Sequence, residues 1–346
     1  MSVRYMSRLK ISVYGLGNFG FALLTHLNRR QEAGKDFSLH GYDNNKGLTD
    51  HLRKKRMHPL HHRNVRISTS VIFPNSSGEL MADTDILVLA VTSDAIKQVI
   101  RGLKSHINRE LILVNTAKAL DAETGLRFST IISACLRDMR HPFSVAMFAG
   151  GTIARDLVNH EPLGVDIASE DRRTLKILKG ILTADNLRVY TTTDIRGVEY
   201  AAALKNVVSI LAGIASGLGI SYGSQTHMIS RAAGEVKKLV VGKLGGKEKT
   251  FSIESQCWGN DMWMSCTGGT RNREFGILLG RGYKPSEAIA EMQERNKTVE
   301  GINTVKAVKR LIEGSESDFP LLQAAGEIVL GCKDPRTTMI RLMNAI

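Results

Sequence analysis

The chain has 346 residues, of which 42% are hydrophobic and 23% charged, and its formal net charge is +13. This composition is typical of an ordinary globular protein rather than a disordered one, and the length predicts two domains. No apolar run follows the basic residues at the N-terminus, so we expect no secretory signal. The most apolar stretch, residues 207–220, is too short to span a bilayer.

The positive charge gathers near the N-terminus, where residues 1–66 hold 13 Lys and Arg against 4 Asp and Glu, a net of +9. A basic surface can bind nucleic acid, but no recognisable nucleic-acid motif accompanies it. Such a surface would also attract anionic cofactors and phosphorylated substrates. The four cysteines form no CxxC pair and no zinc-finger spacing. We therefore predict reduced thiols in a cytoplasmic protein, with no metal site.

Strand and helix patterns alternate through the first half of the chain. Runs rich in β-forming residues predict strands at 9–14, 36–42, 85–91, 111–115 and 145–148, and helical patterns follow at 21–30 and 93–103. Such alternation predicts an α/β fold with a parallel, Rossmann-type sheet. After about residue 195 helical patterns dominate, beginning with one long buried helix over 197–218. We predict a Rossmann domain over residues 1–194 and an all-α substrate-binding domain over residues 195–346.

A glycine-rich motif, Gly15-Leu16-Gly17-Asn18-Phe19-Gly20, follows the first predicted strand and opens the first helix, as a dinucleotide motif requires. Its three glycines would permit a tight turn, approach of the pyrophosphate and close helix–strand packing. Asp43 stands 23 positions after Gly20, where a carboxylate would bind the adenosine ribose and repel a 2′-phosphate. We predict NAD as the cofactor, while nearby Lys46 leaves NADP open. A structural glycine turn is the alternative.

Further candidates follow the ends of later strands, because ligands of such sheets bind beyond the carboxyl ends of the strands. They are Thr92, Ser93, Lys118 and residues 150–154. Lys118 could bind an anion or polarise a carbonyl, or it could be an ordinary surface lysine.

The second half of the chain contains one lysine whose burial would be energetically costly, and one residue pattern that could bind a phosphate. Lys205 lies within a helix of small and apolar residues, where burial and a carboxylate can tune an amine for proton transfer. The alternative is a lysine whose ammonium extends to the surface. Thr270 would cap a helix that begins with Arg271 and Asn272, which suits a phosphate. Asp261 and Arg271 could instead form a structural ion pair.

Together these segments resemble NAD-dependent glycerol-3-phosphate dehydrogenase. The family's lysine-asparagine helix is matched by residues 197–206 and its aspartate loop around Asp261. Its serine-arginine-asparagine-arginine segment is matched by residues 270–273 and its valine-glutamate-glycine segment by residues 299–301. The resemblance covers about residues 11–330.

The resemblance implies NAD-linked interconversion of dihydroxyacetone phosphate and sn-glycerol 3-phosphate by a cytoplasmic homodimer, in glycerophospholipid and carbohydrate metabolism, without nucleic acid or membrane insertion. It implies that Lys205 is the general acid/base, that Lys118 is a second substrate lysine, and that Asp261 orders Lys205 or the substrate hydroxyls. Further implied substrate contacts are Gly150, Thr152, Thr270, Arg271 and Asn272. Implied cofactor contacts are Gly15, Gly17, Asn18, Phe19, Gly20, Asp43, Thr92, Lys118, Ala154, Arg271 and Glu300.

The sequence departs from the family pattern near the expected substrate site. Thr92 replaces a proline, Ala119 a glycine, Gly150-Gly151 a glycine-proline pair and Trp258-Gly259-Asn260-Asp261 a glycine-leucine-glycine-aspartate loop; the stretch from Asp261 to Arg271 is one residue shorter. These changes spare the charged residues but bear on the shape of the substrate loop. A reductase of another small phosphorylated or acidic keto compound is therefore an alternative. A catalytically silent NAD-binding sensor, or a nucleic-acid-associated protein, is another.

One histidine cluster stands outside this pattern. His58-Pro59-Leu60-His61-His62 has donors for a metal, but Pro59 precludes a regular helical spacing across it and no carboxylate or cysteine stands close. We predict an exposed loop without metal.

Overall fold

The computed structural model describes residues 8–295 and 297–343. The chain forms two compact units, and the second takes two short segments from the first half of the sequence. Unit 1 comprises Met1–Ala117, Ser129–Phe148 and Thr152–Ile195; unit 2 comprises Lys118–Phe128, Ala149–Gly151 and Arg196–Ile346. The division into domains at residues 194/195 stays a prediction.

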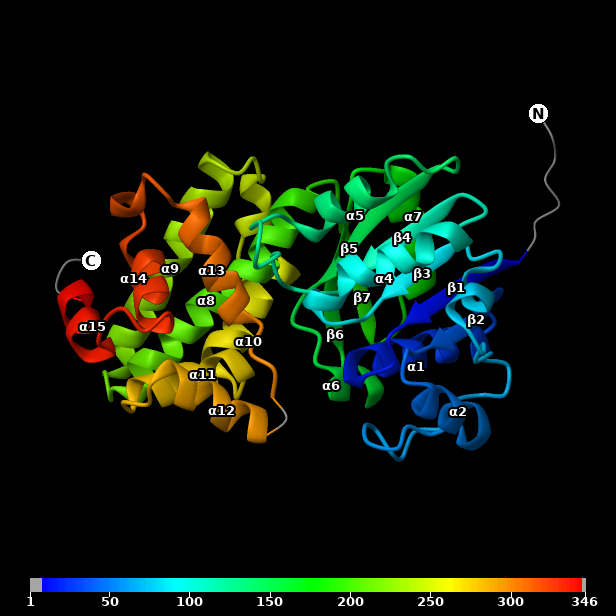
Figure 1. Ribbon diagram of the computed structural model, residues 1–346, viewed down its shortest axis with the longest axis horizontal. Coiled ribbons are helices and arrows are strands. Elements are labelled where there is room, and N and C mark those ends of the chain that lie inside the picture. The colour runs from blue at the N-terminus through cyan, green and yellow to red at the C-terminus, as the bar shows by residue number, and fades with distance from the viewer. Residues whose placement is uncertain (1–7, 296, 344–346) are drawn as a thin grey trace. The chain divides into compact units, whose positions relative to one another are not determined.

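Unit 1 is built on a seven-stranded sheet in the order β2-β1-β3-β4-β5-β6-β7 (Figure 1). The strands are β1 Leu9–Tyr14, β2 Phe37–Tyr42, β3 Ile86–Leu89, β4 Leu111–Asn115, β5 Phe143–Ala149, β6 Leu163–Ser169 and β7 Leu187–Thr192. The pairs from β2 through β5 are parallel, as is β6–β7. Near the start of β5, Val145 accepts a hydrogen bond from the Ser169 hydroxyl at the end of β6. These two strands therefore run in opposite directions.

All five predicted strands and both predicted helices of unit 1 are present, with ends shifted by up to three residues. The helices are α1 Asn18–Glu32, α2 Lys46–Lys55, α3 Ser77–Met81, α4 Ile96–Leu103, α5 Phe128–Leu136, α6 Ala154–Val158 and α7 Arg172–Leu182. The predicted parallel Rossmann-type sheet is confirmed for β1 to β5. Strands β6 and β7 were not predicted, since polar and small residues interrupt the first and alternate residues of the second are exposed.

Unit 2 is helical, as predicted. Its helices are α8 Ile195–Gly217, α9 Tyr222–Gly242, α10 Asp261–Thr267, α11 Arg271–Gly280, α12 Pro285–Glu294, α13 Gly301–Leu311, α14 Pro320–Val329 and α15 Pro335–Met343. Helix α8 is long and apolar enough to cross a membrane by length and composition, but its apolar window is 100% buried inside the protein. It is therefore the core helix of this unit.

Helices α8 and α11 meet through four glycines, Gly213 and Gly217 on one and Gly276 and Gly280 on the other. A Cβ added at Gly276 would lie 2.2 Å from the carbonyl oxygen of Ile210, and a Cβ at any of the other three would lie within 2.4 Å of a carbonyl oxygen on the facing helix. The two backbones are thus in direct contact, which a larger residue would prevent. This contact fixes α11 against α8.

Candidate active site

The glycine loop of unit 1 connects β1 to α1. Gly15 has a φ of +93°, and a Cβ there would lie 2.6 Å from the Ala90 carbonyl oxygen; at Gly20 it would lie 1.9 Å from the Gly15 carbonyl oxygen. Both positions therefore require glycine. Gly17 is exposed and a Cβ there would meet nothing within 4 Å. This open space before a helix N-terminus without a side-chain cap fits a pyrophosphate.

Asp43 follows β2, and its carboxylate already binds two backbone groups. One oxygen accepts from the Leu16 N–H at 2.7 Å, and the other accepts from the Asn45 N–H at 2.9 Å. Asp43 therefore ties the glycine loop to the segment that begins α2. Binding of the ribose by the same carboxylate stays a prediction.

The other predicted cofactor and substrate residues of unit 1 lie at the start of α1, after β3 and after β5. Asn18 and Phe19 begin α1, and the Phe19 ring lies 5.7 Å from the Phe148 ring. Thr92 is exposed after β3. Thr152 is buried, and its hydroxyl has no hydrogen-bond partner among the described residues. Ala154 is the buried first residue of α6.

The histidine segment corrects one expectation. The segment is a loop, but His58 is only 3% exposed. Its Nδ1 accepts from the N–H groups of Leu60 and His61, each at 3.0 Å, so the proton lies on Nε2, which donates to the Leu16 carbonyl at 3.0 Å. Burial, followed by the neighbouring His61, lowers the pKa of His58 to about 4. The prediction of an exposed loop is therefore wrong for His58, because its imidazole satisfies backbone groups inside the protein.

Unit 2 brings three predicted residues into one buried cluster. Asp261, at the start of α10, is 0% exposed and accepts from Lys205 of α8 and from Lys118, each at 2.9 Å and each on a different carboxylate oxygen. Lys118 also donates to the carbonyl of Gly150. The surface-lysine alternative for Lys205 is wrong, since its side chain is 7% exposed and its ammonium is paired.

The charges of this cluster tune one another. Burial lowers the pKa of the Lys205 ammonium; the attraction of Asp261 opposes this effect and the charge of Lys118 adds to it. Burial alone would raise the pKa of the Asp261 carboxyl, but Lys118 and Lys205 outweigh it and hold that pKa below its ordinary value. The cluster therefore combines a fixed carboxylate with a lysine that releases its proton more readily than a free one.

Ser265 also belongs to the cluster, although the sequence analysis did not select it. Its hydroxyl accepts from Lys205 Nζ at 2.7 Å, and its carbonyl accepts from the hydroxyls of Ser209 at 2.6 Å and Thr270 at 2.8 Å. Ser265 follows Asp261 by four positions on α10, so the two side chains share a helix face. The spacing indicates the shared face but does not show that Lys205 reaches the serine. Thr270 precedes α11 as predicted, but its hydroxyl makes no cap bond to that helix.

The predicted phosphate pattern begins α11. Arg271 is exposed in the first turn. Asn272 accepts a hydrogen bond from the Gly301 N–H at 3.0 Å through Oδ1, so its Nδ2 is left as the donor end. A Cβ at Gly301 would lie 2.7 Å from that Oδ1. Glu300, immediately before Gly301, adds a negative charge that acts on Lys205. The alternative of a structural ion pair between Asp261 and Arg271 is wrong, since the ion-pair partners of Asp261 are Lys118 and Lys205.

Two departures from the family pattern lie against each other in unit 2. A Cβ added at Gly151 would lie 3.1 to 3.2 Å from the side-chain amide atoms of Asn260. That the family has proline at position 151 and glycine at position 260 stays a prediction. The smaller residue at one position therefore accommodates the larger one at the other.

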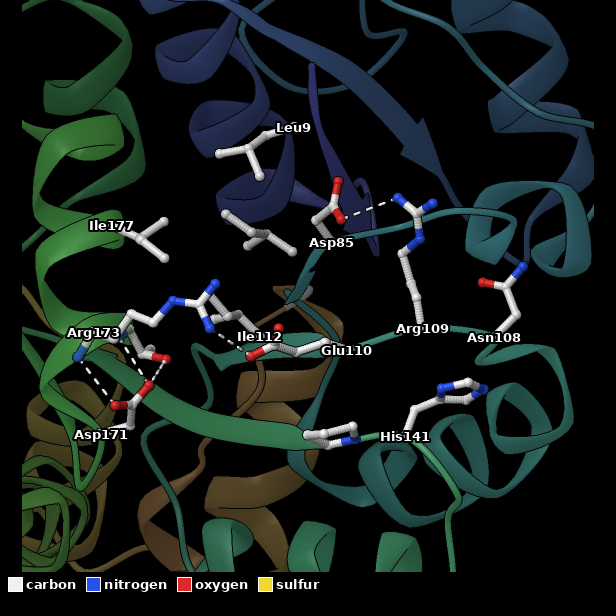
Figure 2. Close-up of a pocket in the computed structure, with 13 residues that line it drawn as sticks. Leu9, Asp85, Asn108, Arg109, Glu110, Ile112, His141, Asp171, Arg173 and Ile177 are labelled. Atoms are coloured by element: carbon white, nitrogen blue, oxygen red, sulfur yellow. Dashed lines mark hydrogen bonds and ion pairs between the residues drawn. The ribbon is translucent and has the colours of Figure 1, made fainter. Parts of the chain in front are cut away.

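A cavity of about 840 Å³ lies in unit 1 by the amino ends of β1, β3 and β4, and none of the predicted site residues lines it. Its charged residues pair with one another: Arg109 binds Asp85 at 3.1 Å and Arg173 binds Glu110 at 3.0 Å (Figure 2). Within residues 8–295 and 297–343, no group of three or more His, Cys, Asp or Glu could hold a metal ion.

Comparisons with known proteins agree over nearly the whole chain. Residues 10–175 match the family model of the NAD-dependent glycerol-3-phosphate dehydrogenase N-terminus, and residues 194–340 match that of its C-terminus. A glycerol-3-phosphate dehydrogenase (NAD(P)+) of Halothermothrix orenii is 30% identical, covering 96% of this chain and 94% of its own length. One from Syntrophotalea carbinolica is 29% identical, covering 97% and 98%. The fold is similar to a solved glycerol-3-phosphate dehydrogenase from Coxiella burnetii, with a TM-score of 0.85 at 23% identity over 97% of this chain and 99% of the other.

Proposed function

The chain belongs to the NAD-dependent glycerol-3-phosphate dehydrogenase family, and we propose that Lys205 is the proton-transfer residue of that reaction in this protein. The substrate pair is dihydroxyacetone phosphate and sn-glycerol 3-phosphate, with NAD or NADP as the redox cofactor. The observation that carries the proposal is the buried Lys205–Asp261–Lys118 cluster.

During ketone reduction, the Lys205 ammonium gives a proton to the oxygen on the central carbon, while that carbon gains a hydride. During alcohol oxidation, the neutral Lys205 amine takes the hydroxyl proton as the hydride leaves. The nicotinamide, when bound, supplies or accepts this hydride. The lowered pKa of Lys205 supports the role, because proton transfer is efficient when the pKa of the group lies near the working pH.

Asp261 and Lys118 hold Lys205 in its place and charge state. Asp261 keeps an opposite charge at 2.9 Å from Lys205, so that the ammonium form remains accessible despite burial. Lys118 shares the same carboxylate and adds positive charge toward the substrate oxygen. The buried, two-lysine geometry favours this role over a structural ion pair, which needs only one cation.

The phosphate is assigned to Arg271, Asn272 and the N-terminus of α11, with Thr270, Gly150 and Thr152 as further substrate contacts. The guanidinium of Arg271 is exposed and suits a bidentate contact with phosphate oxygens. The Nδ2 of Asn272 is oriented as a donor by the bond from Gly301.

For the cofactor, the assigned contacts are the glycine loop from Gly15 to Gly20, including Asn18 and Phe19, then Asp43, Thr92, Lys118, Ala154, Arg271 and Glu300. Asp43 favours NAD, because its charge opposes a 2′-phosphate. We also assign a homodimer in the cytoplasm: the family resemblance supports the dimer, and four free thiols suit a reducing compartment.

The test is oxidation of NADH in the presence of dihydroxyacetone phosphate, by the natural protein and by Lys205→Ala. We expect turnover by the natural protein and a loss of roughly a hundredfold or more in kcat for the variant, as for removal of a general acid. Equal rates in both proteins would overturn the role of Lys205. Turnover only on another phosphorylated or acidic ketone would replace the substrate, and NADH binding without any turnover would indicate a sensor.

A further inference from the structure

The glycine loop of unit 1 is held at Leu16 by bonds to both of its backbone polar groups. Asp43 accepts from the Leu16 N–H at 2.7 Å, and His58 donates to the Leu16 carbonyl at 3.0 Å. The bond from Asp43 belongs to a motif position that the sequence identifies. The bond from His58 comes from a loop 42 positions away, and the motif does not require it.

His58 is fixed for this single task. Its Nδ1 is occupied by the N–H groups of Leu60 and His61, so only Nε2 can donate, and its one recipient is Leu16. The ring lies edge-on to Phe21 at 5.1 Å, and the His62 ring stacks on Phe21 at 6.5 Å. The histidine loop is therefore packed on the first turns of α1, and these ring contacts support the orientation of His58 toward Leu16.

The Leu16 carbonyl and the Gly17 N–H belong to one peptide plane. In a planar trans peptide the C=O and the following N–H point in opposite directions. When His58 holds the carbonyl toward the protein, the Gly17 N–H must face the opposite way, at a glycine that is exposed. Backbone N–H groups of such loops are the donors that bind phosphate.

We propose that His58 is a positioning residue for the cofactor: by holding the Leu16 carbonyl it directs the Gly17 N–H toward the pyrophosphate of the dinucleotide. The proposal rests on the dinucleotide binding of the proposed function and adds a residue from outside the glycine motif. Loss of the bond would allow the Leu16–Gly17 peptide to rotate, and this would weaken cofactor binding while leaving proton transfer at Lys205 intact.

Two substitutions test the hydrogen bonds of the two imidazole nitrogens separately. His58→Asn places an oxygen where Nδ1 lies, so it keeps the bonds to Leu60 and His61 but cannot reach Leu16. His58→Gln places an amide nitrogen where Nε2 lies, so it keeps the bond to Leu16 and loses the other two. His51→Asn, on helix α2, is the matched control. The readouts are the dissociation constant of NADH from fluorescence titration, kcat at saturating NADH, and the melting temperature.

We expect His58→Asn to raise the NADH dissociation constant roughly tenfold, equivalent to about 1.4 kcal/mol, with kcat changed by less than about twofold. His58→Gln and His51→Asn should bind NADH as the natural protein does. Tight binding by His58→Asn would overturn the proposal. So would a folded His58→Gln that binds ten times more weakly, and this second result stands even if His58→Asn does not fold. Failure of the natural protein to bind NADH would overturn both this proposal and the assignment of the cofactor. NADH binding without reduction of dihydroxyacetone phosphate would contradict the assignment of the substrate and leave this proposal in place.

Discussion

The glycine loop of unit 1 and the lysine cluster of unit 2 are built in opposite ways. The loop is six consecutive residues whose backbone we propose to bind the dinucleotide, and it needs glycine at positions 15 and 20 because the chain passes close to itself there. The cluster joins side chains from distant positions, with Lys118 and Asp261 separated by 143 residues. A backbone site is therefore specified locally, whereas a side-chain site depends on the packing of helices that lie far apart in the sequence.

The largest effect on the lysine cluster is expected from removal of its negative charge, the carboxylate of Asp261. In Asp261→Asn the shape remains, but two ammonium groups lose the carboxylate that binds both. The pKa of Lys205 then falls further, since burial and the charge of Lys118 both lower it, so a smaller fraction of the amine carries the proton that reduction requires. We expect kcat for reduction to fall by roughly a hundredfold or more, measured at saturating substrate.

The matched control is Glu199→Gln, which removes the carboxylate of another buried ion pair in unit 2, the one with Arg127 at 2.9 Å. This variant should lose stability, as expected for a broken buried pair, while kcat changes by less than about tenfold. If both variants lost kcat equally, the effect of Asp261→Asn would be one of general packing and the cluster would not be the reaction centre.

The second way is to disturb the glycine contact between α11 and α8, the helix that carries Lys205. In Gly276→Ala the new methyl group would lie 2.2 Å from the Ile210 carbonyl oxygen, and neither backbone can move without separating α8 from α11. We expect a loss of about 2 kcal/mol in the free energy of unfolding, as for overpacking of a core, measured by urea denaturation.

Gly234→Ala in helix α9 provides the comparison for that change. Gly234 is exposed and a Cβ there would meet nothing within 4 Å. Its replacement should therefore stabilise the protein by about 0.5 to 1 kcal/mol through helix propensity. A Gly276→Ala variant as stable as Gly234→Ala would show that α8 and α11 are not in backbone contact.

The smallest predicted effect on activity concerns the contact between Gly151 and Asn260. Gly151→Ala would press against the Asn260 amide, which needs to move by only a few tenths of an ångström. Because Asn260 immediately precedes Asp261, we expect kcat/KM to fall roughly threefold, with Gly151→Ala plus Asn260→Gly close to the natural protein, as for coupled neighbours. Additive effects in this double-mutant cycle would show that the two residues are not energetically coupled.

Sequence reasoning predicted the sheet from β1 to β5 and the long helix α8, because apolar runs with short polar boundaries are local signals. It missed β6 and β7, whose apolar residues are interrupted or half exposed. Lys118, Lys205 and Asp261 could be selected through the family resemblance. That both lysines bind the carboxylate of Asp261 could not be predicted in this way. Ser265 was missed because a serine four positions after an aspartate acquires a role only when Lys205 of another helix reaches it. His58 was predicted exposed, since the sequence does not show that its ring faces Leu16.

The most direct test of the central claim is the pH dependence of kcat in the two directions. Reduction requires the Lys205 ammonium, so its rate should fall as the pH rises through the pKa of Lys205. Oxidation requires the neutral amine, so its rate should rise through the same pKa. Because burial lowers that pKa, both transitions should lie below 10.5, the ordinary value for lysine, and both should disappear in Lys205→Ala. Transitions in the same direction for both reactions, or transitions that persist in the variant, would contradict proton transfer by Lys205.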